Sequence, residues 1–281
     1  MKVMVTGAGG MLAHAVLPLL EAHGHEVLAL RHADLDVTRC EQVRHHAHGF
    51  RPDWVVHLAA FTNVDACEAD ADRAYVVNGL GARNSSMAAA DVGAGLIALS
   101  TDYVFDGASR APRREHDIVG PLSVYGRSKL AGERGAREVN MRHIIVRTQW
   151  LYGAGGRNFV DTILAKARAG EALNVVDDQT GAPTWTGDLS QALVHLMERG
   201  EYGTYHVASS GECTWHEFAV EICRQAGIEA KVGRLSSEEL ARPARRPAYS
   251  VLHNGWYRHV TGQSMPAWQD ALQSYLKSGA A

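Results

Sequence analysis

Short apolar segments alternate with helical patterns along the first half of the chain. The apolar segments cover residues 2–6, 26–30, 53–59, 95–100 and 143–148. Continuous apolar runs of this length are typical of strands that are buried on both faces, as in a parallel sheet. Segments with helical spacing lie between them, for example at residues 11–24 and 81–93. The alternation predicts an α/β fold built on a Rossmann-type, doubly wound parallel sheet.

The composition changes after about residue 150. Loops rich in glycine, proline and polar residues occur at residues 152–159, 177–187 and 242–250. Helical patterns at residues 159–170 and 214–227 lie between these loops. Because binding residues are often carried on loops that a rigid scaffold positions, we expect a smaller C-terminal substrate domain here.

Residues 188–200 and 203–209 again have the pattern of a helix followed by a strand, which indicates a return to the sheet. We therefore predict a dinucleotide-binding Rossmann domain at residues 1–150, with a return segment at about 187–208. The predicted sugar-nucleotide substrate domain is discontinuous and consists of residues 151–186 and 209–281.

The bulk composition excludes several classes of protein. The 281 residues carry a net charge of −3, which provides no basic surface for nucleic acid. The sequence starts directly with a strand pattern, without a signal peptide, and no apolar run approaches the roughly 20 residues that cross a bilayer. The four cysteines are dispersed, with no Cys-x-x-Cys spacing. We expect a cytoplasmic protein that binds neither nucleic acid nor a membrane.

The densest group of potential metal ligands in the sequence consists of His45, His46 and His48. No carboxylate stands at a ligand spacing from them, and a solvated helix end accounts for them better than a metal site. The sequence therefore predicts no metal ligand.

Tyr125 and Lys129 stand four residues apart in SVYGRSKLAGE, a segment with a helical pattern. This spacing places both side chains on one face of a helix. A neighbouring ammonium favours the phenolate and lowers the pKa of a tyrosine, which suits the phenol to proton transfer near neutral pH. The pair alone also fits an ordinary surface helix, so the function depends on the rest of the chain.

The first predicted strand leads into TGAGGMLAHAV, where Gly7, Gly10 and Ala13 match the pattern G-x-x-G-x-x-A. Small residues at these positions allow a tight turn, bring backbone N–H groups close to a pyrophosphate and let the helix pack on the strand. The N-terminus of the helix adds its partial positive charge beneath the phosphates. In this strand–turn–helix context, the pattern predicts binding of a nicotinamide dinucleotide.

The second predicted strand ends at Leu30 and is followed by Arg31 and His32. A carboxylate at this strand end would select NAD through the adenine-ribose hydroxyl, whereas Arg31 can pair with the 2′-phosphate of NADP. A solvated loop arginine has the same sequence context. We expect NADPH as the cofactor, with NADH as the alternative.

The fourth predicted strand ends in STDYVFDG, which places Thr101 at the edge where open α/β sheets bind ligands. A hydroxyl, a phenol and an ammonium that converge beside a nicotinamide form a site for carbonyl reduction. In this interpretation Tyr125 protonates the developing alkoxide and Lys129 holds down the pKa of the phenol, while Thr101 hydrogen-bonds the substrate oxygen.

The motifs STDYVFDG, VYGRSKLAGE, RTQWLYG, DDQTGAPT and RRPAYSVL together resemble the dTDP-4-dehydrorhamnose reductase family of the extended short-chain dehydrogenase/reductases. The similarity runs over nearly the whole chain, and STDYVFDG and DQTGAPT are its most specific parts. The resemblance implies reduction of the C4 keto group of dTDP-4-dehydro-6-deoxy-L-mannose by NAD(P)H to dTDP-L-rhamnose. The implied partner is a dTDP-linked 4-keto-deoxysugar, with a homodimer as the candidate assembly.

The resemblance also implies roles for individual residues. Thr101, Tyr125 and Lys129 match the catalytic residues of the family. The residues expected along the cofactor cleft, besides Arg31, Tyr125 and Lys129, are Gly7, Gly10, Met11, Leu12, Asp36, Val37, Ala59, Ala60, Thr62 and Asn78.

Thr101, Asp102, Tyr103 and Trp150 are expected at the sugar. The indole of Trp150 is expected to pack against the sugar ring and its methyl group. Arg246, in RRPAYS, is our choice for the diphosphate, through charge-assisted hydrogen bonds.

Three departures from the family pattern are present. Met11, Leu12 and Ala13 stand where the family usually has Gln-Leu-Gly, and Ala13 is tolerated because that position needs only a small residue. The other two lie near the sugar-nucleotide side and leave a related nucleotide-linked 4-keto-deoxysugar open as the substrate. Gln149 replaces a serine that often precedes the tryptophan, and SVLHNGW replaces Ser-Val-Leu-Asp.

Two rival functions use the same scaffold. A 4,6-dehydratase or 4-epimerase acts on similar sugars, but dehydratases commonly have Thr-Asp-Glu at this strand end, and Tyr103 is a poor acid in place of the glutamate. A non-catalytic, NADP-binding regulatory subunit, like the methionine adenosyltransferase β subunit, can keep both Tyr and Lys. Oxidation of NAD(P)H with a 4-keto sugar nucleotide distinguishes the enzyme from such a subunit.

Overall fold

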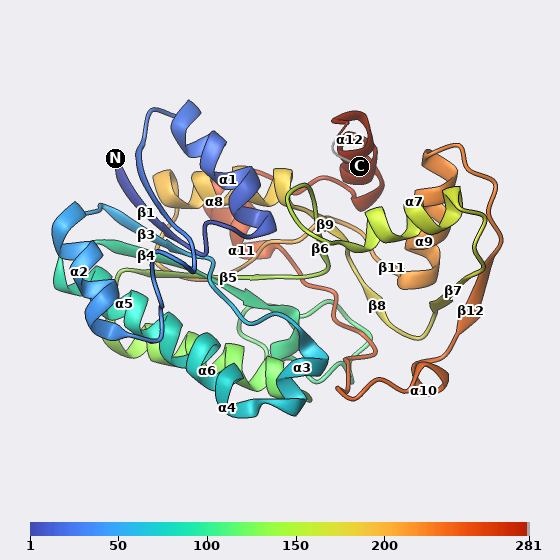
Figure 1. The fold of residues 1–281 in the computed structure, drawn as a ribbon, viewed down its shortest axis with the longest axis horizontal. Coiled ribbons are helices and arrows are strands. Elements are labelled where there is room, and N and C mark those ends of the chain that lie inside the picture. The colour runs from blue at the N-terminus through green and yellow to red at the C-terminus, as the bar shows by residue number, and fades with distance from the viewer. Residues whose placement is uncertain (280–281) are drawn as a thin grey trace.

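The computed structural model describes residues 1–279, which form a helix-covered sheet and a smaller lobe beside it (Figure 1). The sheet has six parallel strands in the order β10-β5-β4-β3-β1-β2. These strands are β1 (Lys2–Thr6), β2 (Glu26–Leu30), β3 (Trp54–His57), β4 (Gly95–Thr101), β5 (His143–Thr148) and β10 (Gly203–His206). The predicted α/β class and the doubly wound parallel sheet are confirmed.

The strand order reverses direction at β1. This strand pairs with β2 on one side, with Val3 opposite Val27, and with β3 on the other, with Val3 opposite Trp54. The connections after β1 and β3 therefore leave the sheet in opposite directions. In open α/β sheets, ligands bind outside the carboxyl ends of the strands at such a reversal.

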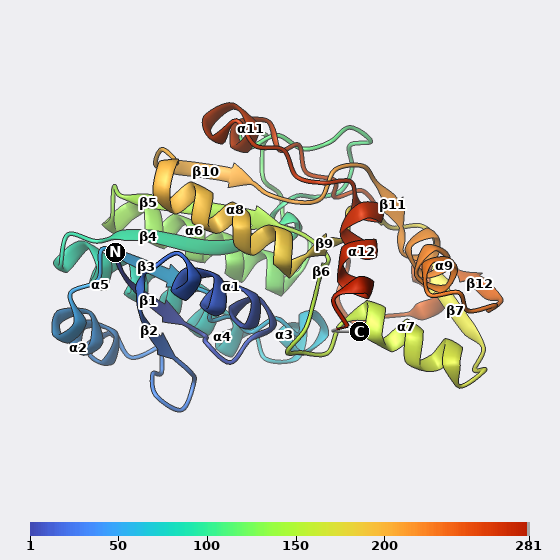
Figure 2. The ribbon, with the colours of Figure 1, turned by 90° about the horizontal axis from the view of Figure 1, so that it is seen from above.

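Helices cover both faces of the sheet (Figures 1 and 2). One face carries α1 (Met11–Ala22), α8 (Thr186–Arg199) and α11 (Gly255–Thr261), and the other carries α2 (Cys40–Phe50), α5 (Gly81–Asp91) and α6 (Val124–Val139). The side chains of β1 alternate between the two faces of the sheet, which explains why helices cover both faces. Val3 and Val5 belong to one apolar cluster and Met4 to the other, because successive strand residues point to opposite faces.

Short helical segments follow β3 and β4. They are α3 (Val64–Ala69), α4 (Ala71–Ala74), the π-helical segment η1 (Tyr75–Leu80) and the 3₁₀ turn η2 (Asp102–Val104). The Oγ1 of Thr101 accepts a hydrogen bond from the N–H of Tyr103, so the last residue of β4 caps the turn that follows it.

The smaller lobe contains the remaining helices of the described residues and three two-stranded pairings. Its elements are β6 (Leu151–Tyr152), α7 (Phe159–Arg168), β7 (Leu173–Val176), β8 (Thr180–Gly181), β9 (Thr184–Trp185), β11 (Cys213–Thr214), α9 (Trp215–Gln225), β12 (Val232–Leu235), α10 (Ser237–Leu240) and α12 (Trp268–Lys277). Its own core is rich in aromatic residues and includes Tyr152, Phe218 and Tyr275. In α9 the predicted helix begins with a capping box between Thr214 and Glu217.

Helix α8 packs against α1, and β10 pairs with β5. The return segment at about 187–208 and the domain boundaries stay predictions. None of the helices within residues 1–279 combines the length and apolar character that crossing a membrane requires.

Gly126 lets α6 lie directly against η2. A Cβ on this residue would overlap the carbonyl oxygen of Tyr103 and lie 3.0 Å from Cβ of Pro121. Since Tyr125 is the neighbouring residue, this close approach fixes the position of its ring relative to the end of β4.

We expect Gly126→Ala to lower the free energy of unfolding by about 1–3 kcal/mol, because the methyl group must push backbone apart. The matched control is Gly49→Ala in α2, where a Cβ would meet nothing within 4 Å. That change should be neutral or stabilise by about 0.5–1 kcal/mol. Urea unfolding of both variants measures the difference, and equal stability would contradict the packing described here.

Candidate active site

A cleft of about 800 Å³ opens at the carboxyl ends of β1, β3, β4 and β5. The sheet domain contributes Gly10 and Lys129 to its walls, and the smaller lobe contributes Arg157 and Trp215. The cleft thus lies at the strand-order reversal and between the two parts of the molecule, where α/β proteins bind their ligands.

The glycine loop after β1 forms one end of the cleft. Gly7 has a φ of +71°, and a Cβ there would lie 2.6 Å from the backbone nitrogen of Ala59. Gly10 is the N-cap of α1 and has no side chain to occupy the free N–H groups of the first helical turn. A phosphate group therefore meets unpaired N–H groups and the positive end of the helix dipole, so this loop fits a dinucleotide.

Thr101 and Asp102 lie at the end of β4, and both are buried. The hydroxyl of Thr101 donates a hydrogen bond to Oδ1 of Asp102 at 2.9 Å. Burial raises the pKa of Asp102 to about 7, although hydrogen bonds from Ser250 and Thr101 oppose this effect. The Asp102 carboxyl group can therefore gain or lose a proton near neutral pH.

Tyr125 and Lys129 lie in the first two turns of α6 and both line the cleft. The ring of Tyr125 packs edge-on against Tyr103, with ring centroids 5.8 Å apart. The ammonium of Lys129 donates to the carbonyl oxygen of Leu99 in β4 at 2.6 Å. The helical spacing thus brings both side chains to the carboxyl end of β4, as predicted from their positions in the sequence.

The predicted effect of Lys129 on the phenol is wrong. The pKa of Tyr125 is raised rather than lowered, by burial first and then by the charge of Asp102, with a small opposing contribution from a hydrogen bond to Thr101. The ammonium of Lys129 is directed at the Leu99 carbonyl, which explains why it does not offset the burial of the phenol. Tyr125 is therefore firmly protonated at neutral pH.

A buried ion pair stands behind Lys129. Glu133, one turn further along α6, accepts two hydrogen bonds from the guanidinium of Arg147 in β5, both at 2.8 Å, and one from Ser100 at 2.6 Å. Burial alone would raise the pKa of Glu133, but Arg147 and Ser100 hold it below its ordinary value. Burial lowers the pKa of Lys129 to about 8, and the charge of Glu133 opposes that shift. The pair therefore helps to keep Lys129 charged.

Two stacked tryptophans form the wall on the side of the smaller lobe. The rings of Trp150 and Trp215 lie 3.7 Å apart between centroids and 9° from parallel. Trp150 has a φ of +47°, a left-handed backbone conformation that L-residues rarely adopt, directly after β5. Both rings line the cleft, so together they form an apolar part of its wall.

Most of the residues predicted for the site line this cleft. They are Gly7, Gly10, Met11, Leu12, Asp36, Val37, Ala59, Ala60, Thr62, Thr101, Asp102, Tyr103, Tyr125, Lys129 and Trp150. Their individual contacts with a cofactor or substrate stay predictions.

Three predicted residues lie outside the cleft lining. Arg31 is exposed and directly precedes His32, which does line the cleft. Asn78 is buried, and its amide exchanges two hydrogen bonds with the backbone of Phe61 and donates a third to Ser128. Asn78 thus positions the loop after β3 against α6.

Arg246 is the third such residue. Its guanidinium pairs with Oδ2 of Asp65 at 3.0 Å and donates to the carbonyl oxygen of Ala244 at 2.9 Å. These two contacts use only part of the five N–H donors of the guanidinium, and the expected role of Arg246 at the diphosphate stays a prediction.

Sequence reasoning did not identify His32, Arg73, Arg157 and Trp215 as residues of the cleft. Trp215 begins a helix in the smaller lobe, and its stacking partner Trp150 is distant in the sequence. The only sequence signal for this contact is the aromatic residue Trp215 at the start of a predicted helix, and no local motif indicates which residue it contacts.

The parallel sheet with its glycine loop, together with Thr101, Tyr125 and Lys129 at one cleft, defines an extended short-chain dehydrogenase/reductase. Residues 1–280 match the model of the RmlD substrate binding domain family. The chain belongs to this family, that of the dTDP-4-dehydrorhamnose reductases, and the resemblance found in the sequence is confirmed.

Similar proteins cover the chain almost completely. It is 43% identical over 276 residues to a dTDP-4-dehydrorhamnose reductase of Streptomyces griseus, and the matched region covers 96% of this chain and 91% of that protein. It is 40% identical over 271 residues to a dTDP-4-keto-6-deoxy-D-glucose reductase of Streptomyces niveus, with coverage of 96% and 94%. A crystal structure of the dTDP-4-dehydrorhamnose reductase of Bacillus anthracis in complex with NADP superposes with a TM-score of 0.96, at 38% identity and 99% coverage of both chains.

We expect Glu133→Gln to lower the free energy of unfolding by about 3–5 kcal/mol, because Arg147 keeps a buried charge without its partner. The same change removes a charge that raises the pKa of Lys129, so this pKa should fall further below 8. The alkaline limb of the pH profile of kcat/KM should then move to lower pH.

The matched control is Glu138→Gln, an exposed residue of the same helix, for which stability should change by less than about 0.5 kcal/mol. Chemical unfolding and pH profiles measure both effects. An unchanged profile in Glu133→Gln would show that the pair has only a structural role.

Proposed function

We propose that this chain reduces the C4 keto group of dTDP-4-dehydro-6-deoxy-L-mannose to give dTDP-L-rhamnose, using a reduced nicotinamide dinucleotide. The observation that carries the proposal is the convergence of Thr101, Tyr125 and Lys129 on one cleft that begins at the glycine loop of α1. The names of the relatives from Streptomyces griseus and Bacillus anthracis support the same reaction.

The chemistry of the reduction follows from the protonation states of the site. A reduced nicotinamide bound in the cleft supplies the hydride that C4 of the sugar accepts. Tyr125 then gives its phenolic proton to the oxygen at C4, so that the product is an alcohol. The raised pKa of Tyr125 suits this direction, because the phenol keeps its proton until a much more basic alkoxide develops.

Lys129 supplies a fixed positive charge on the helix that carries Tyr125. With a pKa of about 8 its side chain is mostly charged at neutral pH, and its contact with Leu99 holds the ammonium at the end of β4. The charge is thus in place at this edge of the cleft before the reaction begins.

Asp102 controls the direction in which the Thr101 hydroxyl points. While Thr101 donates to an ionised Asp102, its hydrogen is not available to the substrate oxygen. Protonated Asp102 can instead donate to Oγ1 of Thr101, which frees the threonine hydrogen to polarise the carbonyl group. A pKa of about 7 makes both states accessible near neutral pH.

Tyr103 favours reduction over dehydration. Burial raises its pKa, followed by the charge of Asp102, so the phenol is a weak acid where a dehydratase needs a strong one. The flat face of Trp150 offers the surface on which we expect the sugar ring to pack, with Trp215 behind it.

We propose that the cofactor is NADPH, with NADH as the alternative. The NADP complex of the Bacillus anthracis relative supports this choice. We expect Arg31, an exposed residue that follows β2 and precedes the cleft-lining His32, to pair with the 2′-phosphate. The cytoplasmic location and the homodimer stay predictions from the sequence.

One alternative substrate has a specific observation in its favour. The relative from Streptomyces niveus is named for dTDP-4-keto-6-deoxy-D-glucose, and its identity to this chain is close to that of the rhamnose-forming relative. Both reactions reduce a C4 ketone of a dTDP sugar, and the stereochemistry of the product separates them.

We expect Tyr125→Phe to lower kcat by roughly 10² or more, because it removes the proton donor and keeps the ring. Cofactor binding should stay close to that of the wild type. Steady-state kinetics and a fluorescence titration with NADPH measure the two effects. Tyr202→Phe, at an exposed tyrosine far from the cleft, is the control and should turn over normally. Normal turnover in Tyr125→Phe would contradict its role as proton donor.

The substrate is tested by offering the 4-keto sugar as its dTDP form and as the free sugar. We expect kcat/KM to fall by at least 10² for the free sugar, because binding energy from the remote nucleotide orients the ring at the nicotinamide. Product stereochemistry should be that of L-rhamnose. Comparable kcat/KM values for the two forms would point to a reductase of small carbonyl compounds instead.

A further inference from the structure

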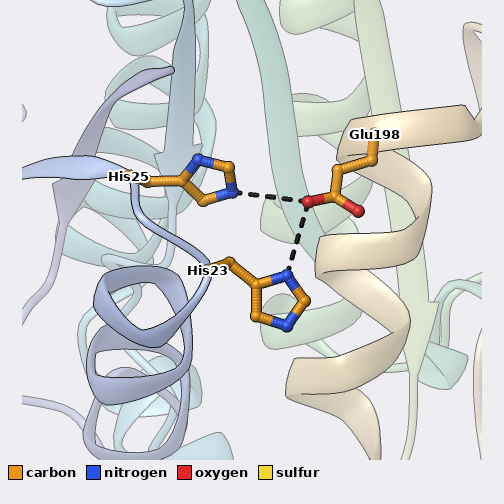
Figure 3. Close-up of side chains that lie close together, drawn as sticks. All are labelled: His23, His25 and Glu198. Atoms are coloured by element: carbon orange, nitrogen blue, oxygen red, sulfur yellow. Dashed lines mark ion pairs between the residues drawn. The ribbon is translucent and has the colours of Figure 1, made fainter.

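Two histidines and a glutamate meet on the side of the sheet that α1 and α8 cover (Figure 3). His23 and His25 lie in the turn that joins α1 to β2, and Glu198 lies in the last turn of α8. Nδ1 of His23 is 3.4 Å from Oε1 of Glu198, and Nε2 of His25 is 3.5 Å from the same oxygen. Within residues 1–279 this is the one group of three such side chains that can hold a metal ion.

Two of the three spacings between the ligand atoms match the edge of a tetrahedral metal site. Ligands at about 2.0–2.1 Å from Zn²⁺ are separated from one another by about 3.4 Å along the edges of a tetrahedron. The two N···O distances are close to that value, and all three atoms lie within 4.8 Å of one another. Small rotations of the side chains are therefore enough to enclose an ion.

The environment of His25 points independently to a ligand. Its side chain is only 6% exposed, and its buried Nε2 lacks a well-formed hydrogen bond, since the contact with Oε1 of Glu198, at 3.5 Å, is at the outer limit of such a bond. A buried polar atom normally has a closer partner. The other ring nitrogen, Nδ1, lies 3.4 Å from the amino nitrogen of Met1.

One carboxylate oxygen faces both rings. Oε1 of Glu198 lies opposite a ring nitrogen of His23 and one of His25, so an ion held between the three atoms contacts all of them. His23 and Glu198 are 35% and 34% exposed, which leaves room for a water molecule as the fourth ligand.

We propose that His23, His25 and Glu198 bind a divalent cation that prefers imidazole ligands, namely Zn²⁺ or a close equivalent, with water in the fourth position. Two imidazoles and one carboxylate favour such an ion over Mg²⁺ or Ca²⁺, which prefer oxygen ligands.

The bound ion joins the C-terminal end of α1 to the C-terminal end of α8. The glycine loop lies at the opposite end of α1, so the metal takes no part in the reduction. Its effect is to stabilise the packing of two helices on one face of the sheet, because it binds the folded chain and has no preformed site in the unfolded one.

The test uses the full chain without an affinity tag, treated with a chelator and then titrated with Zn²⁺ by calorimetry. We expect one ion per chain and an increase in Tm on the order of 5 °C at a hundredfold excess of Zn²⁺ over Kd. Co²⁺ should bind at the same place and give the visible absorption of a tetrahedral complex with nitrogen and oxygen ligands.

His23→Ala and Glu198→Gln each remove one half-exposed ligand, so both variants should fold and should weaken Zn²⁺ binding by about tenfold or more. The matched controls are His48→Ala and Glu201→Gln, which change an exposed histidine of α2 and an exposed glutamate after α8. Both controls should bind Zn²⁺ as the wild type does. Turnover should be the same in all four variants, which separates this site from the proposed reduction.

Equal Zn²⁺ affinity in the wild type and in both ligand variants would overturn the proposal. So would a wild-type protein whose Tm does not respond to Zn²⁺, or a Co²⁺ complex without tetrahedral absorption bands.

Discussion

The buried pair of Glu133 and Arg147 is the constraint on which the reactive side of the molecule depends. It ties α6 to β5 at a depth where neither charge can reach water, so the two elements cannot separate without exposing an unpaired ion. Ser100 joins the pair from β4, and Lys129 stands one turn away on the same helix face. A single electrostatic contact thus links the two strands whose ends form the site to the helix that carries its phenol and ammonium.

Burial, rather than the nearest charge, determines the protonation states at this site. It keeps Tyr125 protonated, raises the pKa of Asp102 to about 7 and lowers the pKa of Lys129 to about 8. The three groups therefore hold the proton where a reduction needs it, on the phenol. The reverse reaction requires the opposite distribution, in which the phenol has already lost its proton.

The sequence was sufficient for the sheet and for the main residues of the cleft, because these depend on local patterns. Apolar runs predicted the parallel strands, and the glycines and the Tyr125–Lys129 spacing predicted which side chains meet at their ends. The contacts that could not be predicted join distant segments. Trp150 stacks on Trp215 in one wall of the cleft, and Glu198 meets two histidines that precede β2. The direction of the pKa shift of Tyr125 was missed for a related reason, since burial is a property of the assembled fold.

The stacked tryptophans have an optical consequence. Trp150 follows the last strand before the smaller lobe, and Trp215 begins a helix inside that lobe, so the parallel rings join the two parts of the molecule. Indoles at 3.7 Å are close enough for their electronic transitions to couple, and this coupling depends steeply on distance and angle. Any shift of one part against the other therefore changes the near-ultraviolet circular dichroism and the fluorescence of the chain, which gives the cleft an intrinsic reporter of its own geometry.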